Sequence, residues 1–135
     1  MINLDFDTYQ KKAHKTAIYP ELPAITADNQ MQRINVPLYP FLKLSGESGE
    51  IIEKIGKVIR DQNSYLPENE TINLEYPTYR ISVEKIIKEL GDELWYMAEI
   101  CTRLGITFDW IAITNLEKLA KRAKENKIKG SGDNR

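Results

Sequence analysis

The chain has very few of the residues that cross-link small proteins or bind soft metals. Its 135 residues include one cysteine, Cys101, and one histidine, His14. A single cysteine excludes an internal disulfide bond and is consistent with a reducing compartment. Because Cys101 lies among apolar residues at helical spacing, we expect it to pack in the core rather than to react.

Long apolar runs and a large net charge are also missing. No run of about 18 apolar residues is present, and Met1 is not followed by a charged and then apolar leader. We therefore expect a soluble, cytoplasmic protein with no membrane partner. Nineteen basic and twenty acidic residues give a formal charge of −1, which provides no global field for a nucleic acid polymer. The length and the lack of internal repeats favour one domain over residues 1–135.

The strongest periodic signal lies at residues 82–104 and predicts one long helix. Its apolar residues recur at steps of three and four, which places them on one buried stripe. Ser82 suits the N-cap position, and Gly105 suits the C′ position that ends a helix. The stripe consists of Val83, Ile87, Leu90, Leu94, Met97, Cys101 and Leu104.

Three further helices are predicted around this one. The first covers residues 5–17, and the last starts at Thr107 and continues to about residue 126. The second starts at Pro40, or after Gly46 if Ser45 caps it, and continues to about residue 61.

Two stretches of the chain carry prolines and no sustained periodicity. Residues 21–40 are predicted to be irregular, and so are residues 62–81, although the latter have room for a short helix or hairpin. The predicted fold is therefore all-α and four-helix bundle-like. Because such a domain has a small core, a helix-mediated homodimer is a natural way to cover its remaining apolar surface.

Acidic residues lie beside the apolar stripes of the second helix and of the long helix. Glu47 and Glu50 are placed relative to their stripe as Glu89 and Asp92 are relative to theirs. Carboxylates three or four residues apart repel each other, and more strongly near a core. Two explanations are open for how this repulsion is offset. The carboxylates are solvated beside nearby lysines, or they bind a divalent cation.

If the two stripes pack together, all four carboxylates come to one edge of a common cleft. Oxygen ligands without a nearby cysteine or histidine suit Mg²⁺ or Mn²⁺ rather than zinc or copper. A di-iron site of the ferritin type is disfavoured, because it needs a Glu-x-x-His on each of two helices and His14 is the only histidine.

Four segments resemble one known family. Glu47-Ser-Gly-Glu50 followed by Glu89-Leu-Gly-Asp92 resembles the E-x-x-E and E-x-x-D signature of the MazG-like all-α nucleoside triphosphate pyrophosphohydrolases. The segment 115–119 with Arg122, and the closing residues 130–135, are also similar to that family. The resemblance implies hydrolysis of a nucleoside triphosphate, of ribo or deoxyribo type, to the monophosphate and pyrophosphate. It also implies an all-α core that pairs with a second subunit, as a homodimer or a dimer of dimers.

The same resemblance implies roles for particular residues. Mg²⁺, with Mn²⁺ as a substitute, would be held by Glu47, Glu50, Glu89 and Asp92. The catalytic set would be Glu50, Glu53 and Glu89, with Glu50 or Glu53 orienting the attacking water. The residues expected to bind the substrate are Tyr96 for the sugar or base, and Asn115, Lys118 and Arg122 for the triphosphate or leaving pyrophosphate.

Two other functions remain open from the sequence. One is an enzyme of the same architecture that acts on another phosphorylated nucleotide, such as a phosphoribosyl intermediate or a nucleoside diphosphate. The other is a non-catalytic helical interaction module whose acidic flank binds a basic partner. Metal dependence separates the enzyme from the module.

Overall fold

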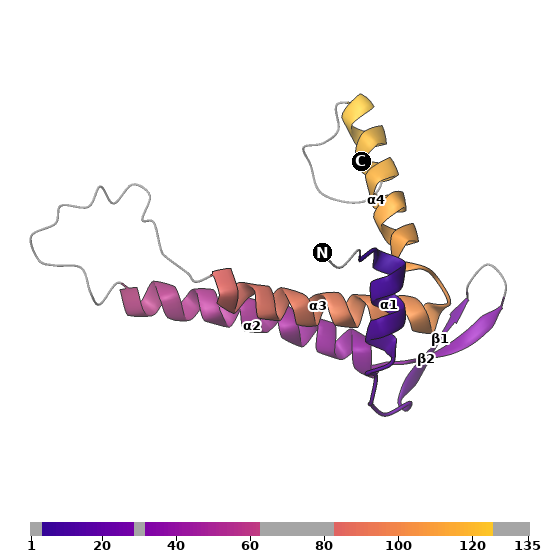
Figure 1. Cartoon of the computed structure of the whole chain (residues 1–135), viewed down its shortest axis with the longest axis horizontal. Helices are drawn as coiled ribbons and strands as arrows, with labels where there is room; N and C mark the ends of the chain where they lie inside the picture. The colour runs from indigo at the N-terminus through magenta and orange to yellow at the C-terminus, as the bar shows by residue number, and fades with distance from the viewer. Residues whose placement is uncertain (1–3, 29–31, 63–82, 126–135) are drawn as a thin grey trace, which may run out of the picture.

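The computed structural model describes residues 4–28, 32–62 and 83–125, which form four helices and a small antiparallel hairpin (Figure 1). The predicted all-α class is confirmed, with the hairpin as an addition. No helix within these three ranges is long and apolar enough to cross a membrane. In chain order the elements are α1 (Phe6–His14), β1 (Ala24–Asp28), β2 (Arg33–Pro37), α2 (Tyr39–Gln62), α3 (Val83–Leu104) and α4 (Phe108–Lys124).

Helices α2 and α3 form a long antiparallel pair that dominates the molecule. Figure 1 shows them side by side, with α1 crossing the C-terminal half of α3 and α4 leaving that end at a steep angle. The pair is joined by a hydrogen bond of 2.5 Å from Ser48 Oγ on α2 to Glu93 Oε1 on α3. This pairing places the acidic flanks of the two helices beside each other.

A small apolar core lies where α1, α3 and α4 meet. Its buried members are Ala13, Ala98, Cys101 and Phe108. The prediction that Cys101 packs in the core is confirmed, since Cys101 is fully buried and burial raises the pKa of its thiol to about 11. Gln10 ties the three helices together, because its side-chain amide donates to Thr102 Oγ1 at 3.0 Å and accepts from the Phe108 backbone N–H at 2.7 Å.

Most helix ends follow the signals in the sequence, but α1 ends at His14, so the predicted extension to residue 17 is wrong. Asp5 caps α1 by accepting from the Thr8 backbone N–H at 2.6 Å, and Thr107 caps α4 by accepting from the Trp110 N–H at 3.2 Å. Gly105 ends α3 with a φ of 68°, the left-handed conformation that favours glycine. Helix α2 begins at Tyr39, so the alternative start after Gly46 is wrong.

The prediction of irregular structure over residues 21–40 is wrong, because this stretch holds the β1–β2 hairpin. Ala24 pairs with Pro37, and Asp28 pairs with Arg33 at the other end of the ladder. Pro23 precedes the first strand and Pro37 is the last residue of the second, where a missing N–H interrupts no central hydrogen bond. The predictions for residues 63–82 lie outside the described residues.

The apolar stripe of α3 is buried only where α1 crosses it. Cys101 is fully buried, but Val83 keeps 68% of its surface exposed and Ile87 keeps 59%. The expectation of one continuous buried stripe is therefore wrong for the N-terminal half of α3 within a single chain. Helix α4 also exposes large apolar side chains, namely Trp110, Ile111, Ile113, Leu116 and Leu119.

We expect two glycine substitutions to change stability in opposite directions. Gly105→Ala should lower the free energy of unfolding by about 1 kcal/mol, because alanine is strained at a positive φ. Gly49→Ala should raise it by up to about 1 kcal/mol, because a Cβ inside α2 meets no atom within 4 Å. Urea unfolding of both variants measures this, and a loss of stability in Gly49→Ala would contradict the open surroundings of that glycine.

Candidate metal site

One face of α2 carries a row of charged residues that begins next to its first turn. Lys43, Glu47, Glu50 and Lys54 follow each other at steps of four, three and four, so they lie on one side of the helix. This side faces α3, where Glu89 and Glu93 lie one turn apart. Two helices therefore contribute charged groups to one strip between them.

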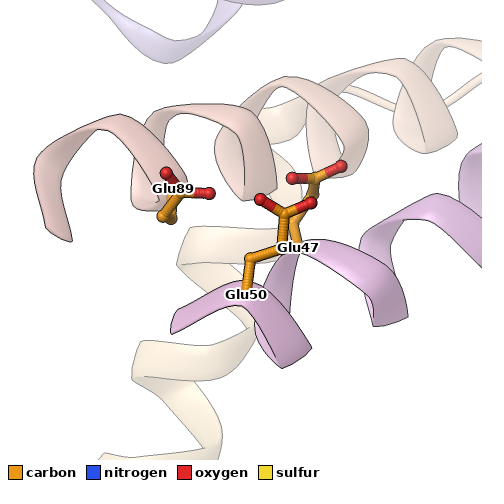
Figure 2. Close-up of side chains that lie close together, drawn as sticks. All are labelled: Glu47, Glu50 and Glu89. Atoms are coloured by element: carbon orange, nitrogen blue, oxygen red, sulfur yellow. The ribbon is translucent and has the colours of Figure 1, made fainter. Parts of the chain in front are cut away.

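Three carboxylates meet in this strip. Glu47 and Glu50 come from α2 and Glu89 comes from α3, and one oxygen of each lies within 4.8 Å of the others. Figure 2 shows the three carboxyl groups clustered between the two helices. We call these three residues the carboxylate cluster.

Two members of the cluster are buried, and a lysine lies at each end of the cluster. Glu47 keeps 6% of its surface exposed and Glu89 keeps 7%, whereas Glu50 is exposed. Lys43 Nζ lies 3.1 Å from Glu47 Oε1, and Lys54 Nζ lies 2.6 Å from Glu89 Oε1. The two lysines offset the repulsion that three neighbouring carboxylates would otherwise feel.

These ion pairs keep the groups charged. The hydrogen bond from Lys54 lowers the pKa of the Glu89 carboxyl, although burial acts in the opposite direction. In return, the Glu89 carboxylate raises the pKa of Lys54, and the Glu47 carboxylate raises that of Lys43. The Glu89 carboxylate is therefore held in its ionised form, which is the form that binds a cation.

The donor set fits a hard divalent cation. Mg²⁺ binds oxygen ligands at about 2.1 Å, so two ligands on opposite sides of one ion lie about 4 Å apart. The spacing in the carboxylate cluster is close to that requirement, and no thiol or imidazole in the described part of the chain joins the group. The open side at Glu50 leaves room for water or a phosphate oxygen.

Two acidic residues expected at the site lie apart from the cluster. Asp92, one turn after Glu89, lies near α1, where its charge adds to the effect of burial in raising the pKa of Tyr9. Glu53 is exposed on α2 and pairs with Lys57 at 2.6 Å. The structure thus brings together three of the four expected metal ligands.

Tyr96 lies at the Glu47 end of the cluster. Burial raises the pKa of its hydroxyl, and the neighbouring Tyr39 and Glu47 raise it further, while Lys43 acts against them. These influences show that the Tyr96 hydroxyl lies near Tyr39, Lys43 and Glu47, which are all on the N-terminal third of α2.

The row expected to bind phosphates lies on α4. Asn115 and Lys118 are exposed and line a cavity of about 440 Å³ with apolar side chains of α4 and of the turn before it. Arg122 follows one turn later. Figure 1 shows α4 directed away from the α2–α3 pair, so within one chain this row and the carboxylate cluster are separate.

A third buried carboxylate, outside the cluster, was not expected from the sequence. The Glu99 side chain on α3 is fully buried and accepts from His14 Nδ1 and Arg103 Nε, each at 2.8 Å, and also from the Tyr19 hydroxyl. His14 is half exposed yet bound to Glu99. The only available signal was the i,i+4 spacing of Glu99 and Arg103, which exposed helices also show.

We expect Lys54→Met to destabilise the metal-free protein more than Lys57→Met. The first substitution leaves buried Glu89 without its counter-charge, whereas the second removes a pair on the exposed side of α2. Thermal unfolding in the presence of a chelator measures the difference.

The pH dependence of stability tests the same contact. Because the folded-state pKa of Glu89 lies below its ordinary value of 4.5, its contribution is present above that pH and lost as the pH falls through the folded-state pKa. Lys54→Met should flatten this acid-side loss, and an unchanged pH profile would contradict the assignment.

Comparison with known proteins agrees with this geometry. The model of the MazG nucleotide pyrophosphohydrolase domain matches residues 40–126, a range that contains all three members of the carboxylate cluster. The chain is also 33% identical over 129 residues to the Gene 37 protein of Mycobacterium phage L5, covering 96% of this chain and 97% of that protein. No solved structure matches. The extent of the domain match shows that this chain belongs to the MazG nucleotide pyrophosphohydrolase family.

Proposed function

We propose that the protein is a Mg²⁺-dependent nucleoside triphosphate pyrophosphohydrolase, which converts a (d)NTP and water to the (d)NMP and pyrophosphate. The observation that carries the proposal is the carboxylate cluster, in which α2 and α3 hold three oxygens within 4.8 Å of one another. Family membership supports the reaction class, because the matched domain is described as a nucleotide pyrophosphohydrolase.

The cation site consists of Glu47, Glu50 and Glu89, with Asp92 as the proposed fourth ligand. Bound Mg²⁺, or Mn²⁺ in its place, neutralises phosphate charge and makes the α-phosphorus a better electrophile. Asp92 lies one turn from Glu89 on α3, and we propose that its carboxylate turns from α1 toward the cluster when the ion and substrate are bound.

Water activation is assigned to the exposed edge of the cluster. Glu50 is the member open to solvent, so its carboxylate is the first choice to accept a proton from the attacking water. Glu53 follows on the same helix and is the second choice, although in the free protein it pairs with Lys57. Glu89 supports catalysis through its place in the cation site.

Substrate contacts are assigned to groups at two places. Tyr96, which lies beside Glu47, would contact the sugar or base. We assign the triphosphate, or the departing pyrophosphate, to Asn115, Lys118 and Arg122, whose amide and cationic groups suit phosphate oxygens.

A homodimer would bring these two places together. Helix α4 lies away from the cluster of its own chain, and its outer side exposes Ile113, Leu116 and Leu119. The N-terminal half of α3 exposes a second apolar surface around Val83 and Ile87. We propose that a second copy covers these surfaces, so that α4 of one subunit approaches the cluster of the other, with a dimer of dimers as a larger assembly.

Hydrolysis by wild-type protein and by Glu89→Gln tests the proposed reaction. Wild-type protein should release pyrophosphate and monophosphate from at least one of a panel of ribo- and deoxyribonucleoside triphosphates, and only with Mg²⁺ or Mn²⁺. Glu89→Gln should lose at least about a hundredfold in rate, because it removes an ionised ligand. Glu84→Gln, on the exposed first turn of the same helix, is the matched control and should keep the wild-type rate.

Two results would contradict this proposal. Release of single phosphate instead of pyrophosphate would assign another reaction to the site. Absence of turnover for every triphosphate, with all three proteins alike, would favour another phosphorylated nucleotide or an interaction module.

Leu116→Asp should shift the protein from dimer to monomer. A charge at the centre of the exposed apolar side of α4 cannot be buried in a subunit interface without a large desolvation cost. Light scattering coupled to gel filtration measures the mass, and Glu117→Gln on the same helix should leave it unchanged. A wild-type monomer at micromolar concentration would overturn the proposed dimer.

A further inference from the structure

Three tyrosines from separate parts of the chain meet beside the carboxylate cluster. Tyr19 lies in the segment after α1, Tyr39 opens α2, and Tyr96 lies on α3. The Tyr19 and Tyr39 rings are stacked, with centroids 5.4 Å apart and an interplanar angle of 12°. The Tyr39 side chain also raises the pKa of the Tyr96 hydroxyl, as does the nearby Glu47 carboxylate. These contacts form a continuous path from the stack to the cluster.

The buried Glu99 carboxylate holds the stack in place through its hydrogen bond with Tyr19. The Tyr19 hydroxyl donates to Glu99 and accepts from Arg103 Nε at 2.8 Å. The other nitrogens of the Arg103 guanidinium bind Glu21 at 3.0 and 3.2 Å, and His14 completes the surroundings of Glu99. These hydrogen bonds fix the Tyr19 ring, because the Tyr19 hydroxyl and Glu21 in the same segment are both bonded to α3.

Tyr39 is the member of this group that remains accessible. Tyr19 covers one face of its ring, yet Tyr39 keeps 37% of its surface exposed. A ring that is held on one face and open elsewhere is a platform on which another planar ring can stack. Phe6 and Trp110 are also exposed aromatics, but they belong to α1 and α4 and do not border the cluster.

Tyr39 is separated from the carboxylate cluster by about two turns of α2. Tyr39, Lys43 and Glu47 are four residues apart in turn, so they share one side of the helix, and Tyr39 precedes Glu47 by about 12 Å of helix rise. A nucleotide whose phosphates lie at the carboxylate cluster can therefore extend along this side of α2 with its base at Tyr39. Lys43 lies between the two, where a phosphate or sugar oxygen would be.

From this geometry we propose that Tyr39 is a specificity-determining residue whose ring stacks on the base of the bound nucleotide. Tyr19 is a positioning residue that holds the Tyr39 ring through the stack, and Glu99 fixes Tyr19 in turn. The inference rests on the proposed function, since it takes the substrate to be a nucleotide with its phosphates at the cluster.

Equilibrium binding tests this proposal without requiring catalysis. The probes are the four deoxynucleoside 5′-monophosphates and inorganic pyrophosphate, each titrated by calorimetry with Mg²⁺ present. Tyr39→Leu should weaken the preferred monophosphate about tenfold and reduce the differences among the four bases, because stacking is lost. Pyrophosphate has no base, so its affinity should be unchanged.

Two further variants separate stacking from general damage. Tyr39→Phe keeps the ring and should keep both the affinity and the base preference within about twofold. Tyr19→Leu should reduce the differences among bases while leaving pyrophosphate binding unchanged, which loss of fold would not do. If Tyr39→Leu fails to fold, intermolecular nuclear Overhauser effects in wild-type protein, from Tyr39 ring protons to base protons, provide the same test.

The outcomes distinguish this proposal from the proposed function. Monophosphate binding that depends on Tyr39, without hydrolysis of any triphosphate, would support the base platform and refute the reaction. Equal binding of every monophosphate by wild type and Tyr39→Leu would overturn the platform even if hydrolysis proceeds. Wild-type protein that binds pyrophosphate but no monophosphate would overturn it as well.

Discussion

The structure depends on the balance of charge between α2 and α3. Two of the three carboxylates in the cluster are buried, and their mutual repulsion opposes the pairing of the helices unless positive charge lies beside them. In the free protein Lys43 and Lys54 supply that charge. A divalent cation would supply the same total charge as the two lysines at one point, so metal binding and ion pairing compete for one set of oxygens.

Helix α3 connects the two buried groups of acidic residues. Glu89, Glu93, Tyr96, Glu99 and Arg103 follow each other at steps of three and four, so one side of the helix carries the cluster, the aromatic group and the Glu99 network. Because α1 and the segment after it pack against the far end, α3 transmits their position to the site. Helix α1, although it is remote from the cluster, is therefore connected to the proposed site through α3.

The helices and the carboxylate cluster were readable from the sequence because both follow from local spacing. Capping by Asp5 and Thr107, the stop at Gly105 and the matching flanks of α2 and α3 all rest on residues a few positions apart. The hairpin was not predicted because the prolines suggested a loop, whereas Pro23 precedes β1, Pro37 ends β2 and Pro40 lies in the first turn of α2.

Features that depend on packing could not be read in this way. The position of Asp92 near Tyr9 depends on how α1 crosses α3, which no local pattern specifies. Local spacing alone suggests that Glu99 is a surface residue, whereas His14 at the end of α1 and Tyr19 in the segment after α1 both bind it. The exposed half of the α3 stripe was expected to be buried because periodicity records which face is apolar, not what covers it.

The central claim is that Glu47, Glu50 and Glu89 form one divalent cation site. Electron paramagnetic resonance of free Mn²⁺ during titration of the metal-free protein tests it most directly, because bound and free ions are distinguished without any substrate. We predict saturable binding that Mg²⁺ displaces and that each single Glu→Gln substitution in the cluster weakens strongly, whereas Glu84→Gln leaves it unchanged. Mn²⁺ binding that is absent, or equal in all of these variants, would contradict the account.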